Sequence, residues 1–158
     1  MELFEPYELR KALMDLAEDI RENYVQHLIE SKHYTTEYTL IDSVRCDVEV
    51  GDRGFNVVMT LKDYWKYLEE GTKPHFPPLE KIREWIEIKP ILPRPVNGIR
   101  PTKNQLAYLI GRKIAEEGTK GTHDLSKTED AVLPMYSERL SAALRHDVER
   151  YILKVIAE

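Results

Sequence analysis

The stretch "VRCDVEVGDRGFNVVMTL", residues 44–61, decides the fold class, because its hydrophobic residues alternate with polar ones on both sides of "GDRG". Alternation with a period of two places every second side chain on the same face of a strand. Two such runs joined by a glycine-bearing turn predict a β-hairpin with one buried face, and a hairpin is incompatible with an all-helical fold. The residues predicted for the buried face are Val44, Cys46, Val48, Val50, Phe55, Val57, Met59 and Leu61.

Helical spacing is found on both sides of the hairpin. Upstream, hydrophobic residues recur at steps of three and four between Leu9 and Leu28, which predicts a long amphipathic helix over about residues 6–31, starting at Pro6. Downstream, "DYWKYLEEGT" is predicted to be a short helix or the end of the second strand. A second helix is predicted between Pro78 and Pro90, and a third runs from the N-cap Thr102, with Gln105 completing a capping box, to Gly118. The last helix is predicted from Pro134 onward.

The predicted fold class is α+β: a long N-terminal helix, a β-hairpin or small antiparallel sheet, and then several helices packed on it. A chain of 158 residues is close to the size of one domain, so a single domain over residues 1–158 is expected. The proline-rich stretch "PILPRPVNGIRP", residues 90–101, should form an extended, exposed loop that is mobile until a partner orders it. A second loop is predicted at "GTKGTHDLSKTED", residues 118–130.

Composition argues against several classes of protein. Hydrophobic residues make up 42% and charged residues 32%, which is too apolar for a disordered chain. The net charge of −5 argues against wrapping nucleic acid, and no run approaches the roughly 18 apolar residues of a membrane span. The first residues, "MELFEPYELR", lack the basic and apolar regions of a signal peptide, so a cytoplasmic protein is expected. The single Cys46 is interpreted as a small buried hydrophobe.

The letters "EEGTK" occur twice, at Glu69–Lys73 and at Glu116–Lys120. In each copy a helical segment ends in Gly-Thr, so the glycine should close the helix with positive φ, and alanine there should cost about 1 kcal/mol. The flanking residues agree little, which disfavours an internal duplication. The glutamates oppose the helix dipole, so they are either tolerated, solvated helix ends or partners of cations from another subunit. The candidate interface residues are Glu69, Glu70, Glu116 and Glu117, and the predicted structural caps are Gly71, Thr72, Gly118 and Thr119.

Three short motifs give the chain a family resemblance: the aromatic-rich "YWKYLEEGT" after the hairpin, the tryptophan-bearing "PPLEKIREWI", and "IGRKIAEEGTK". Together with the long first helix, residues 1–121 resemble the phage neck and tail-completion family, the head–tail joining proteins of tailed bacteriophages and prophages. Members of that family commonly follow the second Gly-Thr with a proline and an aromatic or leucine, whereas this chain has "GTHDLSKTED" and a longer proline-rich loop. The resemblance is carried mainly by Tyr64, Tyr67, Glu69, Gly71, Thr72, Trp85, Ile114, Gly118 and Thr119.

This resemblance implies a structural protein of the virion neck or tail, assembled in the host cytoplasm. It implies a homo-oligomeric ring, a hexamer or dodecamer, that joins the head connector or head-closure protein to the tail proteins. DNA would pass through the lumen without sequence-specific binding, because an acidic wall repels phosphate. The family acts by binding its neighbours, so no catalysis, cofactor, metal or membrane is implied.

Signals of an enzyme are weak in the sequence. None of the five histidines has the helical spacing of a zinc protease, and "GRKIAEEGTKGT" lacks the residue order of a phosphate-binding loop. Arg139 and His146 share one face of the predicted last helix, which is similar to the arginine and histidine pair of all-helical RNases. An RNase-like protein that uses this pair is the alternative function. The hairpin argues against it, so no enzymatic activity is expected.

Overall fold

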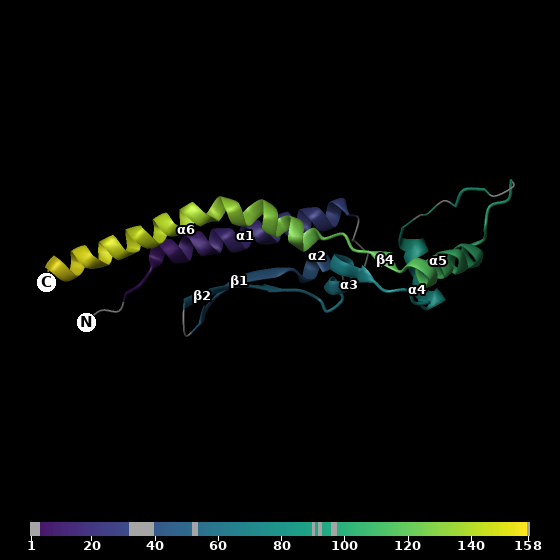
Figure 1. The fold of residues 1–158 in the computed structure, drawn as a ribbon, viewed down its shortest axis with the longest axis horizontal. Helices are drawn as coiled ribbons and strands as arrows, with labels where there is room; N and C mark the ends of the chain where they lie inside the picture. Colours follow the sequence, from purple (N-terminus) through teal and green to yellow (C-terminus); the bar gives the residue numbers. More distant parts are fainter. Residues whose placement is uncertain are drawn as a thin grey trace. The chain divides into compact units, whose positions relative to one another are not determined.

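The computed structural model describes residues 4–31, 40–51, 54–89, 91, 93–95 and 98–157, and it has the α+β architecture expected from the sequence (Figure 1). Its elements in chain order are α1 (Tyr7–Glu30), α2 (Leu40–Ser43), β1 (Arg45–Gly51), β2 (Gly54–Thr60), α3 (Trp65–Glu70), β3 (Gly71–Thr72), α4 (Leu79–Ile88), α5 (Lys103–Glu117), β4 (Thr119–Lys120) and α6 (Asp124–Ala157).

The chain divides into two compact units. Unit 1 comprises Met1–Tyr34, Tyr38–Asp63 and Asp124–Glu158, and unit 2 comprises Thr35–Glu37 and Tyr64–His123. Unit 1 therefore contains α1, α2, α6 and the β1–β2 hairpin, whereas unit 2 contains α3, α4, α5 and the short strands β3 and β4. The expectation of one domain stays a prediction, because compactness alone does not show that a unit folds independently.

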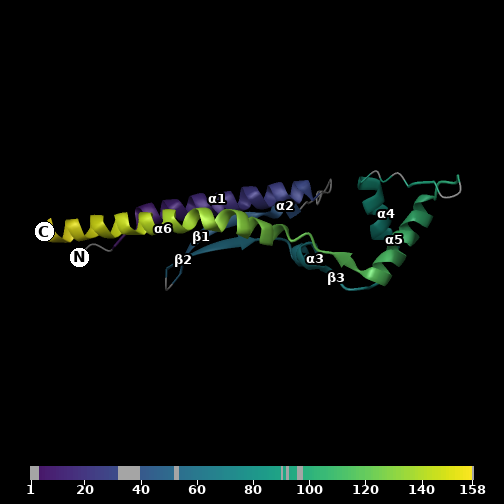
Figure 2. The ribbon, with the colours of Figure 1, turned by 45° about the horizontal axis from the view of Figure 1, so that its top comes forward.

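Unit 1 is built on α1 and α6, which lie side by side and antiparallel (Figure 1, Figure 2). Both ends of this helix pair are fixed by contacts between the helices. The Ser31 hydroxyl, just after α1, donates to the Asp124 carboxylate at 2.8 Å, and the rings of Phe4 and Tyr151 meet edge to face at 5.3 Å. The hydrophobic core of the pair consists of Leu16, Val132 and Tyr136, against which Leu13, Ile20, Val57 and Leu140 pack.

The predicted hairpin is confirmed. Its antiparallel register pairs the residues of the predicted buried face across the two strands: Cys46 with Met59, Val48 with Val57, and Val50 with Phe55. Val57 packs on the core of α1 and α6, so this face covers the helix pair, although Val50 near the turn is 72% exposed. Cys46 is half-buried, not fully buried as expected. Burial and the neighbouring Asp47 raise the pKa of the Cys46 thiol, which keeps it protonated and weakly nucleophilic.

The prediction that the last helix starts at Pro134 is wrong, because α6 begins at Asp124 and continues through the proline. Most of the second predicted loop therefore belongs to β4 and α6. Thr128 explains the error: it is fully buried at a position where a hydrophobic residue would have revealed the helix, and its hydroxyl donates to the Asp124 carbonyl oxygen at 2.8 Å. A proline inside a helix costs about 3 kcal/mol. The buried Val132 and Tyr136 on either side of Pro134 supply packing that offsets this cost.

Unit 2 contains the packed pair of α4 and α5. The capping box at the start of α5 is confirmed, since Thr102 Oγ1 accepts the Gln105 N–H at 3.3 Å and the Thr102 N–H donates to Gln105 Oε1 at 2.9 Å. Gly111 permits the close approach of the two helices, because an added Cβ would lie 3.3 Å from the Ile82 side chain of α4. The core of the pair consists of Ile82, Ile86 and Ala107, with Leu79, Leu106 and Ile110 packed against them.

The predicted proline-rich loop, residues 90–101, connects α4 to α5. Pro90, Leu92, Val96 and Asn97 lie outside the described residues. Of the remainder, the exposed residues are Arg94, Pro95, Gly98, Ile99 and Arg100. These residues agree with the prediction of an exposed loop, and its mobility and ordering by a partner stay predictions.

Candidate functional site

The two copies of EEGTK meet in space. Strands β3 and β4, one from each copy, pair antiparallel, so that Gly71 faces Lys120 and Thr72 faces Thr119. The hydroxyl oxygens of the two threonines lie 2.9 Å apart and share a hydrogen bond. The repeated letters therefore build one feature, here called the EEGTK ladder, which consists of residues 69–73 and 116–120. The sequence predicts the helix end in each copy but not their pairing.

The glycines of the ladder have a backbone conformation that other residues avoid. Gly71 and Gly118 have φ angles of 79° and 72°, which confirms the predicted positive φ. Their ψ angles are −168° and −162°, so the chain leaves each helix directly into the ladder without a left-handed cap. Backbone with this combination of angles is nearly exclusive to glycine. Space imposes the same restriction, since an added Cβ would lie 2.1 Å from the carbonyl oxygen of Thr119 or Thr72, respectively.

The chain that follows each copy closes the helix that precedes the other copy. Thr122 donates its backbone N–H to the Leu68 carbonyl oxygen of α3 at 2.8 Å. His75 donates its backbone N–H to the Ile114 carbonyl oxygen of α5 at 3.4 Å. Carbonyl groups in the last turn of a helix need hydrogen-bond donors from outside the regular helical pattern. The ladder therefore joins the C-terminal ends of α3 and α5.

The glutamates of the two copies have different surroundings. Those of the second copy each lie near a cation one turn earlier in α5: Glu116 near Arg112 at 3.6 Å, and Glu117 near Lys113 at 3.9 Å. These four side chains are exposed, so each pair contributes about 0.3–0.5 kcal/mol. In the first copy, Glu70 is exposed and Glu69 is half-buried. A cation from another subunit beside Glu69 or Glu70 stays a prediction.

The residues that carry the family resemblance all belong to unit 2. They come from α3 and the turn before it, the EEGTK ladder, α4 and the end of α5. Their three aromatic side chains are accessible, since Tyr64 is 41% exposed, Tyr67 is 63% exposed and Trp85 is 37% exposed. Aromatic residues are enriched in protein interfaces, so this unit offers side chains suited to binding a partner.

Arg139, the arginine of the RNase alternative, contacts α1 and Tyr136, and a shared site with His146 stays a prediction. The Arg139 guanidinium binds the Asp15 carboxylate and donates to the Tyr136 hydroxyl oxygen at 3.3 Å, and it lies 5.1 Å from the centre of the Tyr136 ring. His146 is exposed, seven positions further along α6, which is about 10 Å of helical rise. Arg139 therefore has a structural role in joining α1 to α6.

Metal-binding clusters are absent from the part of the chain that the structure describes: no group of three or more His, Cys, Asp or Glu side chains there could hold a metal ion. Two of the histidines considered from the sequence make local contacts. His75 Nδ1 lies 2.8 Å from the Lys73 carbonyl oxygen, and His27 Nδ1 lies 3.8 Å from the Glu30 carboxylate. His33 lies outside the described residues.

The pKa of the Tyr136 hydroxyl is shifted by its surroundings. It is 3% exposed, and its hydroxyl donates to the Asp19 carboxylate at 2.5 Å. Burial first, and then this hydrogen bond and the charge of Asp19, raise the pKa of Tyr136 to about 12. The neutral phenol is thus the form that the folded protein favours.

A titration of tyrosine absorbance should therefore show a late component. The chain has nine tyrosines, and the Tyr136 phenol should ionise near pH 12 in the folded protein, with the ordinary value close to 10 regained in denaturant. The raised pKa means that the contribution of Tyr136 to stability is full below pH 10 and is lost as the pH rises through 12. A Tyr136→Phe variant should lack the late component. Its persistence in that variant would contradict the assignment.

Comparisons with known proteins add no family to this description. Among the described residues, no helix is both long enough and apolar enough to cross a membrane. Searches against protein-family models, curated proteins and solved structures each found no match. The resemblance to phage neck and tail-completion proteins therefore rests on the quoted motifs alone.

Proposed function

We propose that this chain is a structural protein of the neck or tail-completion type from a tailed phage or prophage, and that it assembles into a ring joining the head connector to the tail. It acts by binding and catalyses no reaction. The observation that carries the proposal is the EEGTK ladder, because it gives the two Gly-Thr motifs of the resemblance a common structural task. The ladder holds together the ends of α3 and α5, the helices that carry Tyr67 and Ile114 of the resemblance.

The exposed aromatic residues of unit 2 support a binding role. Single exposed apolar residues are ordinary on protein surfaces, whereas several in one small unit indicate contact with a partner. The aromatic side chains of unit 2 with large exposed fractions are Tyr64 at 41%, Tyr67 at 63%, Phe76 at 51%, Trp85 at 37% and Tyr108 at 53%. No comparable observation favours the RNase alternative, since Arg139 is bound to Asp15 and Tyr136.

Deletion of the coding sequence from the phage or prophage that carries it tests the proposal. The expected result is DNA-filled heads and free tails that do not join, because the ring between them is missing. Electron microscopy of lysates measures the fraction of joined particles, and a wild-type copy supplied in trans should restore it. Joined particles at the wild-type fraction without the protein would refute the proposed function.

Complementation with charge-reversed copies tests the predicted interface at the first EEGTK copy. The double variant Glu69→Lys with Glu70→Lys should restore joining poorly, because a cation of the neighbouring subunit would lose its partner. The matched control is Glu129→Lys with Asp130→Lys, an exposed acidic pair on α6 that gives the same change in net charge. If both double variants join heads to tails equally well, Glu69 and Glu70 are tolerated helix ends and not interface residues.

A further inference from the structure

Charge is divided unequally between the two units. Unit 1 holds 12 of the chain's 23 basic residues and 20 of its 28 acidic residues, a formal net charge of −8, and unit 2 holds the other 11 basic and 8 acidic residues, a net charge of +3. Both units hold nearly equal numbers of basic residues, so the difference in net charge comes mainly from the acidic residues. Opposite net charges favour an encounter of unit 1 of one copy with unit 2 of another.

The C-terminal part of α6, in unit 1, is hydrophobic almost all the way round. Phe4 meets the ring of Tyr151, and Arg150 donates to the Glu5 carbonyl oxygen at 3.5 Å, so the start of the chain accompanies α6 to this point. The residues after Tyr151 have large exposed fractions: Ile152 at 49%, Leu153 at 69%, Val155 at 54% and Ile156 at 76%. A helix with apolar residues on all faces is normally buried. This segment, residues 152–156, is here called the α6 tip.

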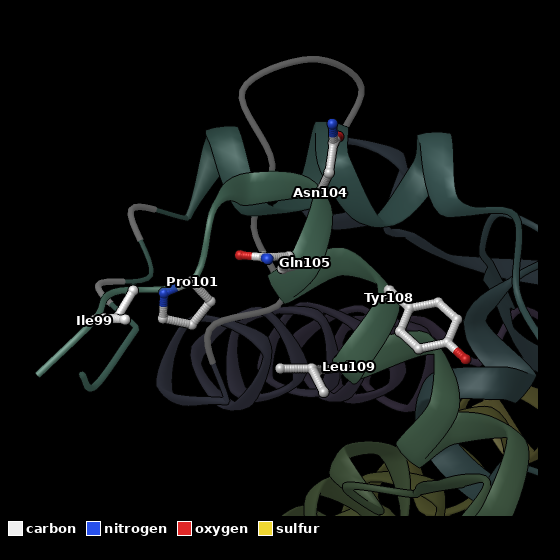
Figure 3. A pocket seen from close by; sticks show the side chains of 6 residues that line it. All are labelled: Ile99, Pro101, Asn104, Gln105, Tyr108 and Leu109. Atoms are coloured by element: carbon white, nitrogen blue, oxygen red, sulfur yellow. The ribbon is translucent and has the colours of Figure 1, made fainter. Parts of the chain in front are cut away.

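Unit 2 has an open apolar groove of about 670 Å³ beside α5 (Figure 3). It lies at the face of α5 that carries Tyr108 and Leu109, whereas α4 covers the buried Ala107. Tyr108 is 53% exposed and Leu109 is 43% exposed, so this face of α5 is accessible within unit 2. The groove is lined by Ile99, Pro101, Asn104, Gln105, Tyr108 and Leu109.

We infer that the groove of unit 2 binds the α6 tip of a second copy of this chain. An apolar helix laid into a hydrophobic groove is a recurring mode of recognition. The inference deepens the proposed function, because it names the contact through which the subunits of the ring would join.

Charge complementarity favours this occupant. The tip belongs to the unit with a net charge of −8, and the groove belongs to the unit with a net charge of +3. Lys154, the one charged residue of the tip, already has a partner within its own copy. Arg100 is exposed between the groove residues Ile99 and Pro101, in the unit with net positive charge, and so lies at the edge of the groove. The contact joins unlike surfaces, the tip of one copy and the groove of the next, which is the heterologous type that builds rings.

Sedimentation velocity of the purified full chain over a range of concentrations tests the inference. Wild-type protein should associate. A tip variant, Ile152→Glu with Ile156→Glu, and a groove variant, Ile99→Glu with Leu109→Glu, should each raise the dissociation constant at least about 10-fold. All four residues are well exposed, so these changes should leave the fold intact, as circular dichroism would check. The matched control is Met135→Glu, a 62% exposed residue of α6 away from the tip, which should associate like the wild type.

A mixture of the two variants distinguishes tip-in-groove contact from other pairings. The groove variant keeps an intact tip and the tip variant keeps an intact groove, so together they should form heterodimers and nothing larger. Three results would overturn the inference. The mixture could stay monomeric, the groove variant could associate like the wild type, or the wild-type protein could be monomeric at every concentration. These results concern self-association alone, whereas the particle counts after deletion concern the proposed function, so either can fail without the other.

Discussion

Gly71→Ala and Gly118→Ala are each expected to lower the free energy of unfolding of unit 2 by about 2–5 kcal/mol, well above the roughly 1 kcal/mol expected for a helix-ending glycine alone. Part of the loss is backbone strain, since φ angles of 79° and 72° with extended ψ are unfavourable for alanine. The rest is steric, because the added Cβ would lie 2.1 Å from a carbonyl oxygen of the opposite strand. That obstacle is backbone, so no side-chain rotation relieves it.

Tryptophan fluorescence during urea unfolding measures this loss selectively, because both tryptophans of the chain, Trp65 and Trp85, belong to unit 2. Gly98→Ala is the matched control. Gly98 has the same φ of 79° as Gly71, but nothing lies within 4 Å of its added Cβ, so it measures the cost of positive φ without a clash. We expect about 1 kcal/mol there. Equal losses at Gly71 and Gly98 would show that the close approach of the strands contributes nothing.

Features with a local signal are predictable from the sequence. The hairpin follows from period-two alternation over residues 44–61, and α1 follows from period-3.6 spacing, because each pattern directly reflects which side chains face the core. The capping box of Thr102 and Gln105 is equally local, since its two partners are three residues apart. These elements have the predicted types, and their ends agree within a residue or two.

The EEGTK ladder has no such signal. Its strands are two residues long, which is too short for an alternating pattern, and Thr72 and Thr119 are 47 positions apart. The positive φ of the glycines is predictable from the preceding helical segments, whereas the partner that makes glycine sterically necessary is not. The repeat itself is the one clue to the pairing, and it can be recognised as such only after the two copies are seen together.

The polar contacts at the two ends of the α1–α6 pair could not be predicted from the sequence, for a related reason. Each involves a buried acid of α6, Asp124 or Asp147, at a position where a helical pattern predicts a hydrophobic residue. A buried carboxylate is favourable only when hydrogen-bond donors surround it. Each acid has one local donor three positions along α6, Lys127 for Asp124 and Arg150 for Asp147. The donors that join the two helices come from α1 and the residue just after it, more than 90 positions away, so no local window of sequence contains them.

Asp147 acts as the cap of a helix to which it does not belong. The N-cap position of α1 is Pro6, whose side chain makes no capping hydrogen bond. The Asp147 carboxylate supplies it from α6, accepting the Glu8 N–H at 3.1 Å and the Leu9 N–H at 2.8 Å. Arg150 balances the charge at 3.0 Å. Asp147, which is 1% exposed, thus caps the N-terminus of α1 and joins the two helices of unit 1. Its negative charge also interacts favourably with the positive end of the α1 dipole.

Asp147→Ala should therefore lower the free energy of unfolding of unit 1 by about 2–4 kcal/mol, since it leaves two amide donors and a guanidinium without their acceptor. Far-UV circular dichroism during urea unfolding measures the loss, because α1 and α6 are the longest helices of the chain. Asp147→Asn should lose roughly half as much, because the amide keeps one acceptor oxygen but turns an NH2 toward the other donor. Asp130→Ala, at an exposed aspartate of the same helix, should change stability by less than about 0.5 kcal/mol. If Asp147→Ala unfolds at the same urea concentration as Asp130→Ala, then α1 is held by its hydrophobic face alone and the cap contributes nothing.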